Sequence, residues 1–128
     1  MRRERTSTGT DWEQQVGYSR AIRAGDTVRV AGTIATDDDG EVVAPGDPYE
    51  QTKHAFGIVA DALAALDAAI EDVVQTRMYV TDIDDQGRVG EAHSEFFADV
   101  RPVATMVEVS GLATPEAVVE VEAVAQVE

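Results

Sequence analysis

The chain has 128 residues, with 10 Lys and Arg against 25 Asp and Glu, a formal net charge of −15, and no cysteine. This length, with 44% hydrophobic residues, predicts a single domain over residues 1–128 with its own core. The lack of cysteine excludes a disulfide framework and a thiol nucleophile, and two histidines argue against a zinc site. The negative charge argues against a nucleic-acid or anionic-membrane partner, because clustered Lys and Arg carry phosphate binding.

Carboxylates are spread over the whole chain, and nine of the ten basic residues are arginine. Such a surface repels itself at low ionic strength, whereas the Debye length falls to ~3 Å in 1 M salt and the repulsion is screened. We interpret the chain as a cytoplasmic protein of a salt-loving (halophilic) organism. An ordinary acidic mesophile protein is the alternative.

Salt adaptation predicts that the melting temperature climbs as KCl is raised from low to molar concentration. The physical reason is that screening removes a repulsion that destabilises the compact state. Thermal unfolding followed across this range of KCl measures the effect. A melting temperature that does not respond to KCl would contradict the interpretation.

No segment favours a membrane or an export signal. Residues 1–5 are rich in arginine but have no apolar run behind them, so they do not read as a signal peptide. The longest mainly apolar stretch, residues 56–70, contains Asp61 and Asp67 and is too short to span a bilayer. We therefore expect no membrane partner.

The first half of the chain predicts a hairpin and one long helix. Residues 1–19 are polar and indicate no clear element, whereas residues 20–36 predict a hairpin that turns at Gly25-Asp26. Asp47 followed by Pro48 is typical of a helix start. From there to Ile70 the apolar residues recur at spacings of three and four, which predicts one apolar helix face.

The second half predicts a strand, a helix and two more strands. The expected bounds are residues 74–81 for the strand, 89–100 for a helix ended by Pro102, and 104–109 and 117–127 for the last strands. In the last strand Val119, Val121, Ala123, Ala125 and Val127 share one face, and the other face carries Val118, Glu120, Glu122, Val124 and Gln126. This order predicts an α+β fold, a mixed β-sheet with two helices packed on one face.

Such a sheet leaves its second face uncovered. Val118 and Val124 would lie exposed there beside the carboxylates of the last strand. A half-apolar open face of that size usually marks a subunit interface. We therefore expect a homo-oligomer.

Several segments together resemble the Rid (reactive intermediate deaminase, YjgF-like) family. The likeness runs from about Gly17 to Ala125, and no single motif carries it; the ordered set with matching spacing does. The segments are residues 17–19 (Gly-Tyr-Ser), 30–34, 47–66, 72–82, 95–97, 101–102, 106–109 and 119–125.

The resemblance implies a chorismate-mutase-like fold and a barrel-like homotrimer with ligand pockets between subunits. It also implies hydrolysis of short-lived enamines and imines, such as 2-aminoacrylate, to a keto acid and ammonia. The family uses no metal and no organic cofactor for this, so we expect neither here. A small molecule is the expected partner.

Three residues match pocket positions of the family. Glu120 matches the glutamate on the last strand that orients water, and we take it as the catalytic residue. Tyr18 matches a pocket tyrosine, and Gly32 matches a glycine whose backbone lies against the ligand. The resemblance thus implies substrate binding by Tyr18 and Gly32.

Three other polar pocket positions of the family are changed. Ala104 stands where an arginine clamps the substrate carboxylate with two hydrogen bonds. Ala31 replaces a common serine, and Gly90 replaces a common asparagine. We therefore expect an altered substrate choice.

Further candidates for substrate binding come from the residues themselves. Arg77 lies in the middle of a strand, where it either binds an acidic group or pairs with a glutamate on a neighbouring strand. His93 either moves protons in a pocket or packs half-buried beside Phe96 and Phe97. Thr105 and Met106 follow the vacant position 104, where Thr105 offers a hydroxyl or packs within its strand.

Arg20 and Arg23 are interpreted as solvated charges of the hairpin. The functional hypothesis is a Rid-family deaminase of small enamines or imines. The alternative is a trimeric small-molecule-binding or stress-protective protein without turnover. A ribonuclease fits poorly, because a chain of net charge −15 repels RNA.

Overall fold

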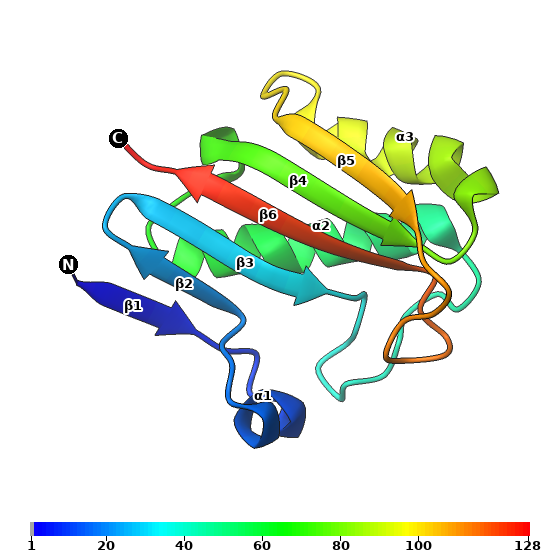
Figure 1. Ribbon diagram of the computed structural model, residues 1–128, viewed down its shortest axis with the longest axis horizontal. Helices are drawn as coiled ribbons and strands as arrows, with labels where there is room; N and C mark the ends of the chain where they lie inside the picture. Colours follow the sequence, from blue (N-terminus) through cyan, green and yellow to red (C-terminus); the bar gives the residue numbers. More distant parts are fainter. Residues whose placement is uncertain (1) are drawn as a thin grey trace.

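A six-stranded mixed sheet forms the centre of the computed structural model, which describes residues 2–128 (Figure 1). The strands are β1 (Arg3–Thr6), β2 (Ala21–Ala24), β3 (Thr27–Thr33), β4 (Val73–Val80), β5 (Val103–Glu108) and β6 (Val119–Gln126). They lie in the order β1-β2-β3-β6-β4-β5, and β4 and β5 are the one parallel pair among these strands. The expected α+β fold is confirmed.

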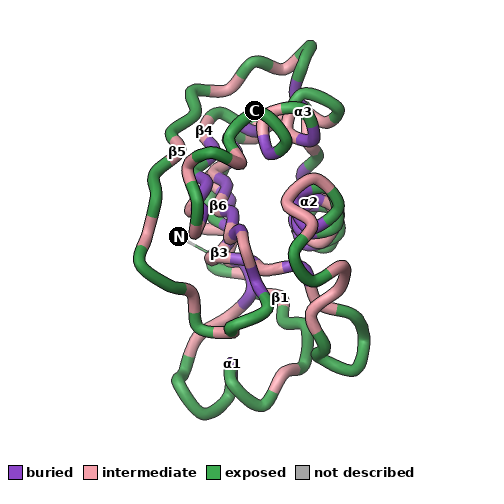
Figure 2. Tube along the Cα trace, turned by 90° about the vertical axis from the view of Figure 1, so that its right-hand side faces the viewer, coloured by how far each residue is buried: buried purple, intermediate pink, exposed green. Residues whose placement is uncertain are grey.

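Two long helices cover one face of this sheet. They are α2 (Pro48–Ala65) and α3 (Gln86–Phe97), and the edge-on view shows both on the same side with buried residues facing the strands (Figure 2). Short 3₁₀ turns at Ile70–Asp72 and Ile83–Asp85 connect these helices to the strands. No helix within residues 2–128 is long and apolar enough to cross a bilayer.

The predicted start of α2 is confirmed, but its predicted end is wrong. The Asp47 side chain accepts a hydrogen bond from the Glu50 amide at 3.0 Å, and Pro48 occupies the first turn. The helix ends at Ala65 because Asp67 adopts a left-handed φ of 59° and the Ala68 amide bonds back to the Leu63 carbonyl. Residue 70 therefore lies in the following 3₁₀ turn.

The end of α3 also differs from the prediction. The helix ends at Phe97, before Pro102 can act on it. Arg101 takes a φ of 56°, and its amide donates to the Phe97 carbonyl at 2.9 Å. A left-handed residue thus reverses the chain, and the proline follows that reversal.

The alternation predicted for β6 is confirmed. Val119, Val121 and Ala125 are fully buried and face the helices, and the intervening side chains lie on the open face of the sheet. Phe56 and Leu63 of α2 close the core from the helix side. This packing holds the backbone of β6 rigidly and so fixes the position of Glu120 on its other face.

The N-terminal segment contains two elements that the sequence did not predict, β1 and the short helix α1 (Asp11–Val16). Glu13, only 1% exposed, accepts hydrogen bonds from the Ser7 and Thr8 hydroxyls and so ties the two elements together. Burial alone would raise the pKa of Glu13. The hydrogen bonds from Ser7 and Thr8 and the charge of Arg20 outweigh burial and lower that pKa, so the carboxylate is ionised.

The second face of the sheet has no helix over it within residues 2–128 (Figure 2). Three valines of β4 and β5 are conspicuously exposed: Val74 at 48%, Val103 at 69% and Val107 at 41%. Arg77 and Glu122 lie opposite one another on the same face. The expectation that a second copy covers this face stays a prediction.

Candidate functional site

A crevice of about 460 Å³ lies where β3 ends beside β6. The N-terminal segment, the residues before β2, the end of β3, α2 and the loop before β6 all contribute to its wall. The side chains used below come from this set: Trp12, Tyr18, Arg20, Gly32, Thr114 and Glu120. Segments far apart in the sequence thus converge on one small space, which is the geometry of a ligand site.

Gly32 and the Glu120 side chain are in close contact within this crevice. A Cβ added at position 32 would lie 2.1 Å from Oε2 of Glu120 and 3.0 Å from its Cδ. The register of β3 against β6 shifts between Val30 and Thr33, so the glycine sits in an irregular stretch of the strand. The missing side chain of Gly32 is what leaves room for the carboxylate.

Glu120 is the titratable group of the crevice with the environment of an acid–base residue. Its pKa is raised above the usual 4.5, first by burial and second by the nearby charge of Glu122, while Arg20 works in the opposite direction. Among residues 2–128 no side chain donates a hydrogen bond to it. The carboxylate therefore has capacity to bind a water or a ligand.

Glu122→Gln is expected to lower the pKa of Glu120 towards its usual value, because the substitution removes the like charge that opposes ionisation. A titration of the Glu120 carboxyl carbon by NMR measures the shift. Asp99→Asn, which removes one exposed carboxylate after α3 and away from the crevice, serves as the control. An unchanged Glu120 pKa in the Gln variant would contradict the assigned cause.

Arg20 lies next to this pair, and its interpretation as a solvated charge is wrong. The residue is 9% exposed, and its Nη2 donates to the Gly32 carbonyl at 2.7 Å. The guanidinium carbon lies 5.6 Å from the centre of the Tyr18 ring, within the range of a cation–π contact. Nε is buried without a hydrogen-bond partner in the described part of the chain.

Arg23 is also tied to the protein rather than freely solvated. Its Nη1 donates to the Leu66 carbonyl at 2.9 Å, and its Nε donates to the Gly25 carbonyl at 2.9 Å. A cation at the carboxyl end of α2 complements the helix dipole and satisfies a terminal carbonyl. Arg23 therefore has a structural role, away from the crevice.

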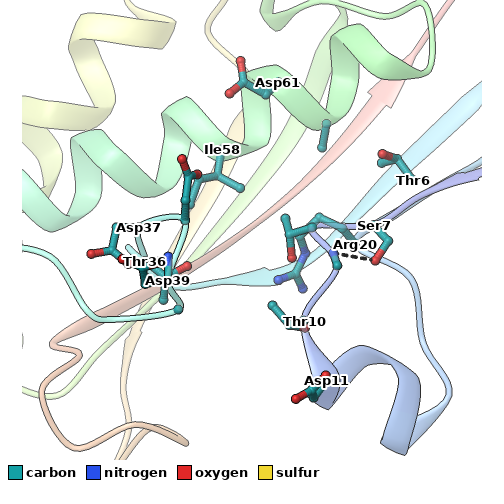
Figure 3. Close-up of a pocket in the computed structure, with 15 residues that line it drawn as sticks. Thr6, Ser7, Thr10, Asp11, Arg20, Thr36, Asp37, Asp39, Ile58 and Asp61 are labelled. Carbon is teal, nitrogen blue, oxygen red and sulfur yellow. Dashed lines mark hydrogen bonds between the residues drawn. The ribbon is translucent and has the colours of Figure 1, made fainter.

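A second hollow of about 660 Å³ adjoins the crevice (Figure 3). The two share Arg20 and five further lining residues. Aspartates from three segments line this second hollow: Asp11, Asp37, Asp38, Asp39 and Asp61. No group of three or more potential metal ligands within residues 2–128 is arranged to hold a metal ion.

Three of the predicted substrate-binding residues lie outside the crevice of the same chain. Arg77 is exposed on β4, opposite Glu122 of β6 and Thr105 of β5. Neither of the two ion pairs within residues 2–128 involves it. Thr105 is exposed on the same open face, whereas Met106 packs partly against the core.

His93 lies between α3 and the sheet, also outside the crevice. Its Nε2 is 2.9 Å from the Thr76 hydroxyl, and its ring packs edge-on against Phe56 and at 4.6 Å from the ring centre of Phe97. Burial lowers the pKa of His93 below 6.5. This placement describes a half-buried, hydrogen-bonded histidine of the core.

The free energy of unfolding is expected to fall as the pH drops below 6.5, the usual pKa of histidine. The unfolded chain takes up a proton there, while buried His93 resists it, so acid favours unfolding. Denaturant unfolding of the wild type and of His93→Gln, which keeps hydrogen-bonding groups but does not titrate, measures the difference. Parallel pH profiles of the two proteins would contradict this assignment.

Known proteins of one family share the sequence pattern and the fold of this chain. The family model described as Endoribonuclease L-PSP matches residues 9–127. The chain belongs to the Rid/YjgF family. A crystal structure of a YjgF/YER057c/UK114-family member from Mycobacterium tuberculosis superposes with a TM-score of 0.89 at 44% identity, covering 98% of this chain and 100% of that one.

Two curated proteins are similar to this chain over most of its length. An uncharacterized protein of Streptomyces coelicolor is 44% identical over 118 residues, 92% of this chain and 87% of the relative. The 3-aminoacrylate deaminase RutC of Acinetobacter baylyi is 30% identical over 110 residues, 86% of each chain. The family expectation is thereby confirmed, and with it the chorismate-mutase-like fold.

Sequence reasoning had identified Tyr18, Gly32 and Glu120, and the structure brings these three to one crevice. It missed Arg20, because nothing in the sequence around this residue signals that its side chain is buried against the Gly32 carbonyl. Trp12 also lines the crevice while remaining 59% exposed.

Proposed function

We propose that this protein is a hydrolytic deaminase of small reactive enamines or imines. The observation that carries the proposal is the half-buried Glu120 carboxylate, with its raised pKa, held against Gly32 in a crevice that Tyr18 and Arg20 also line. The name of one relative, the 3-aminoacrylate deaminase RutC, describes a reaction of this class.

The reaction needs only water and a group that moves protons. Water adds to the imine carbon while Glu120 accepts a proton from that water. Glu120 then delivers the proton to the nitrogen. As the carbon–nitrogen bond breaks, Glu120 passes the proton of the new hydroxyl to the leaving nitrogen, so a keto acid and ammonia are released. A carboxyl group whose pKa is raised serves both steps, because its acid and base forms are closer in energy near neutral pH.

The substrate choice is proposed to differ from that of family members with the arginine clamp. Ala104 of β5 replaces that arginine and has no group that could hold a carboxylate. Loss of one charge-assisted hydrogen-bonded pair weakens binding by roughly ten- to a hundredfold unless another cation takes over.

A panel of imines that an amino acid oxidase generates in situ tests the proposed deaminase activity. The protein is expected to accelerate ammonia release over the oxidase alone with at least one member of the panel. Heat-denatured protein provides the control. If ammonia release stays at the background rate for every neutral, basic and acidic imine in the panel, the deaminase proposal fails.

The second candidate is a trimeric small-molecule-binding protein without turnover, and the vacant position at Ala104 favours it. Keto acids or imine analogues would then raise the melting temperature, as any ligand of the folded state does. No ammonia would appear in the panel assay. The two measurements together separate a binder from an enzyme.

RNA cleavage, which the family model's name describes, is not proposed. The net charge is −15, and aspartates line the hollow beside the crevice. RNA binding depends on cations that neutralise its phosphates. No protection or cleavage of RNA is therefore expected.

We propose further that three copies assemble through the open face of the sheet. Val103 and Val107 are exposed there, and the candidate residues Arg77 and Thr105 lie beside them, away from the crevice of their own chain. A neighbouring copy would cover the valines and bring polar groups of β4 and β5 towards the crevice.

Light scattering in high salt tests the assembly. The wild type is expected to show a mass three times the 13.7 kDa of one chain. Val107→Asp is expected to lower that mass, since it buries a charge in the interface. Val16→Asp places the same charge on α1, away from the face, and should leave the mass unchanged. A wild-type mass of one chain would overturn the proposal.

A further inference from the structure

Arg20 is a buried cation that forms no direct ion pair within residues 2–128, although its charge acts at longer range on Glu13 and Glu120. Its guanidinium makes a hydrogen bond to the Gly32 carbonyl at 2.7 Å, and neither of the two ion pairs formed within residues 2–128 includes it. Its Nε has no hydrogen-bond partner in that range either. A buried donor without a partner costs free energy, and such a group in a native structure calls for an explanation.

The position of Arg20 supplies that explanation. The residue lines both the 460 Å³ crevice and the adjoining hollow, and it is the one Lys, Arg or His among the described residues that line either space. Its Nη2 contacts Gly32, the residue against which the Glu120 carboxylate lies. A group held by Arg20 would therefore lie close to Glu120.

The remaining charges of the two spaces are negative. Glu120 lines the crevice, and aspartates, Asp37 and Asp61 among them, line the adjoining hollow (Figure 3). An anionic ligand is repelled by this wall except at the guanidinium. A ligand with a second carboxylate would place that group among the aspartates without a cation to receive it.

We propose that Arg20 binds the single carboxylate of the substrate, in place of the arginine that position 104 lacks, and thereby selects monocarboxylates over dicarboxylates. The inference rests on the proposed function in that it calls the bound ligand a substrate, but binding of a carboxylate by Arg20 does not require turnover. Guanidinium is suited to this role because its planar donors match the two oxygens of a carboxylate. The Tyr18 ring beside it helps to hold the guanidinium plane in place.

Binding of unreactive ligands tests the site without relying on deamination. The probes are pyruvate, its uncharged counterpart pyruvamide, and the dicarboxylate 2-oxoglutarate, titrated into the full-length protein at constant ionic strength and followed by NMR shifts. The wild type is expected to bind pyruvate about ten- to a hundredfold more tightly than pyruvamide. It is also expected to bind 2-oxoglutarate more weakly than pyruvate.

Arg20→Met is expected to abolish the preference for pyruvate over pyruvamide. Arg88→Met is the matched control, because it removes the same charge from an exposed site on α3 beside Tyr49. Arg20→Lys keeps the charge but loses the planar fork, so it should show an intermediate preference. Circular dichroism checks the fold of each variant.

Two results would overturn the inference: a folded Arg20→Met that still prefers pyruvate, and a wild type that binds pyruvate and pyruvamide equally. The second result overturns the inference even if Arg20→Met does not fold, because it is measured on the wild type. The outcome is separate from that of the deaminase proposal. If the protein releases no ammonia but shows the Arg20-dependent preference, the proposed carboxylate site stands and the proposed deaminase function fails. If the wild type deaminates its substrate and a folded Arg20→Met still prefers pyruvate, the deaminase function stands and the proposed carboxylate site fails.

Discussion

Glu120→Gln is expected to lower the rate of ammonia release by ~10²–10⁴-fold, the usual contribution of a general acid–base group. The amide is nearly the same size as the carboxylate, so it fills the space above Gly32, but it cannot accept a proton from water. Steady-state kinetics on the best imine of the panel measures the loss. The melting temperature should stay close to that of the wild type, because no hydrogen bond to the Glu120 side chain is broken.

The pH profile adds a second readout for the same residue. Hydrolysis needs ionised Glu120 to activate water, and burial together with Glu122 raises the pKa of that group. Activity of the wild type should therefore fall on the acid side at a pH above 4.5, the ordinary value for glutamate. The residual activity of Glu120→Gln should lack this decline. A variant with full activity would show that another group moves the protons.

The elements predicted correctly from the sequence depend on local signals. The alternation along β6 and the cap formed by Asp47 and Pro48 are properties of neighbouring residues, and both are present in the structure. The N-terminal β1 has no such signal, and α1 has only a short one, in which the Thr10 hydroxyl accepts a hydrogen bond from the Glu13 amide and Gly17 ends the helix with a left-handed φ of 89°. Both elements are held by Glu13, whose partners Ser7 and Thr8 are identified only once the chain is folded.

The same distinction applies to the candidate site. Tyr18, Gly32 and Glu120 followed from the likeness of short segments to a known family, and the crevice contains all three. The role of Arg20 could not be predicted from its surroundings in the sequence, where it reads as an ordinary hairpin charge. Its burial depends on the Gly32 carbonyl, 12 residues along the chain, and on the irregular pairing of β3 with β6.

In the proposed trimer, a neighbouring copy would complete the other side of the crevice. Arg77, Thr105 and Met106 lie on β4 and β5 and do not line the crevice of their own chain. One sequence describes one protomer, so the composition of a pocket shared by two copies does not follow from it. The proposed trimer would decide whether these residues reach the ligand, and the mass measurement with Val107→Asp therefore bears on the site as well.

Gly32→Ala is expected to lower the rate of ammonia release by up to about a hundredfold, although residue 120 itself is unchanged. The added Cβ would lie 2.1 Å from Oε2 of Glu120, a separation that atoms cannot adopt, so the carboxylate must move away from the position in which it faces the water. A small displacement of a catalytic group from its productive geometry costs up to about a hundredfold in rate.

The stability of Gly32→Ala distinguishes this displacement from a damaged fold. The atoms that the methyl group meets belong to the flexible end of the Glu120 side chain rather than to the backbone, and Gly32 does not have a positive φ. The melting temperature should therefore change little. Gly57→Ala in the middle of α2 is the control, because nothing lies within 4 Å of the added Cβ there. That change should stabilise the helix by about 1 kcal/mol and leave the rate unaltered. If Gly32→Ala keeps the wild-type rate, the close approach of Glu120 to the strand has no part in the chemistry, and the proposed role of the glutamate would need another geometry.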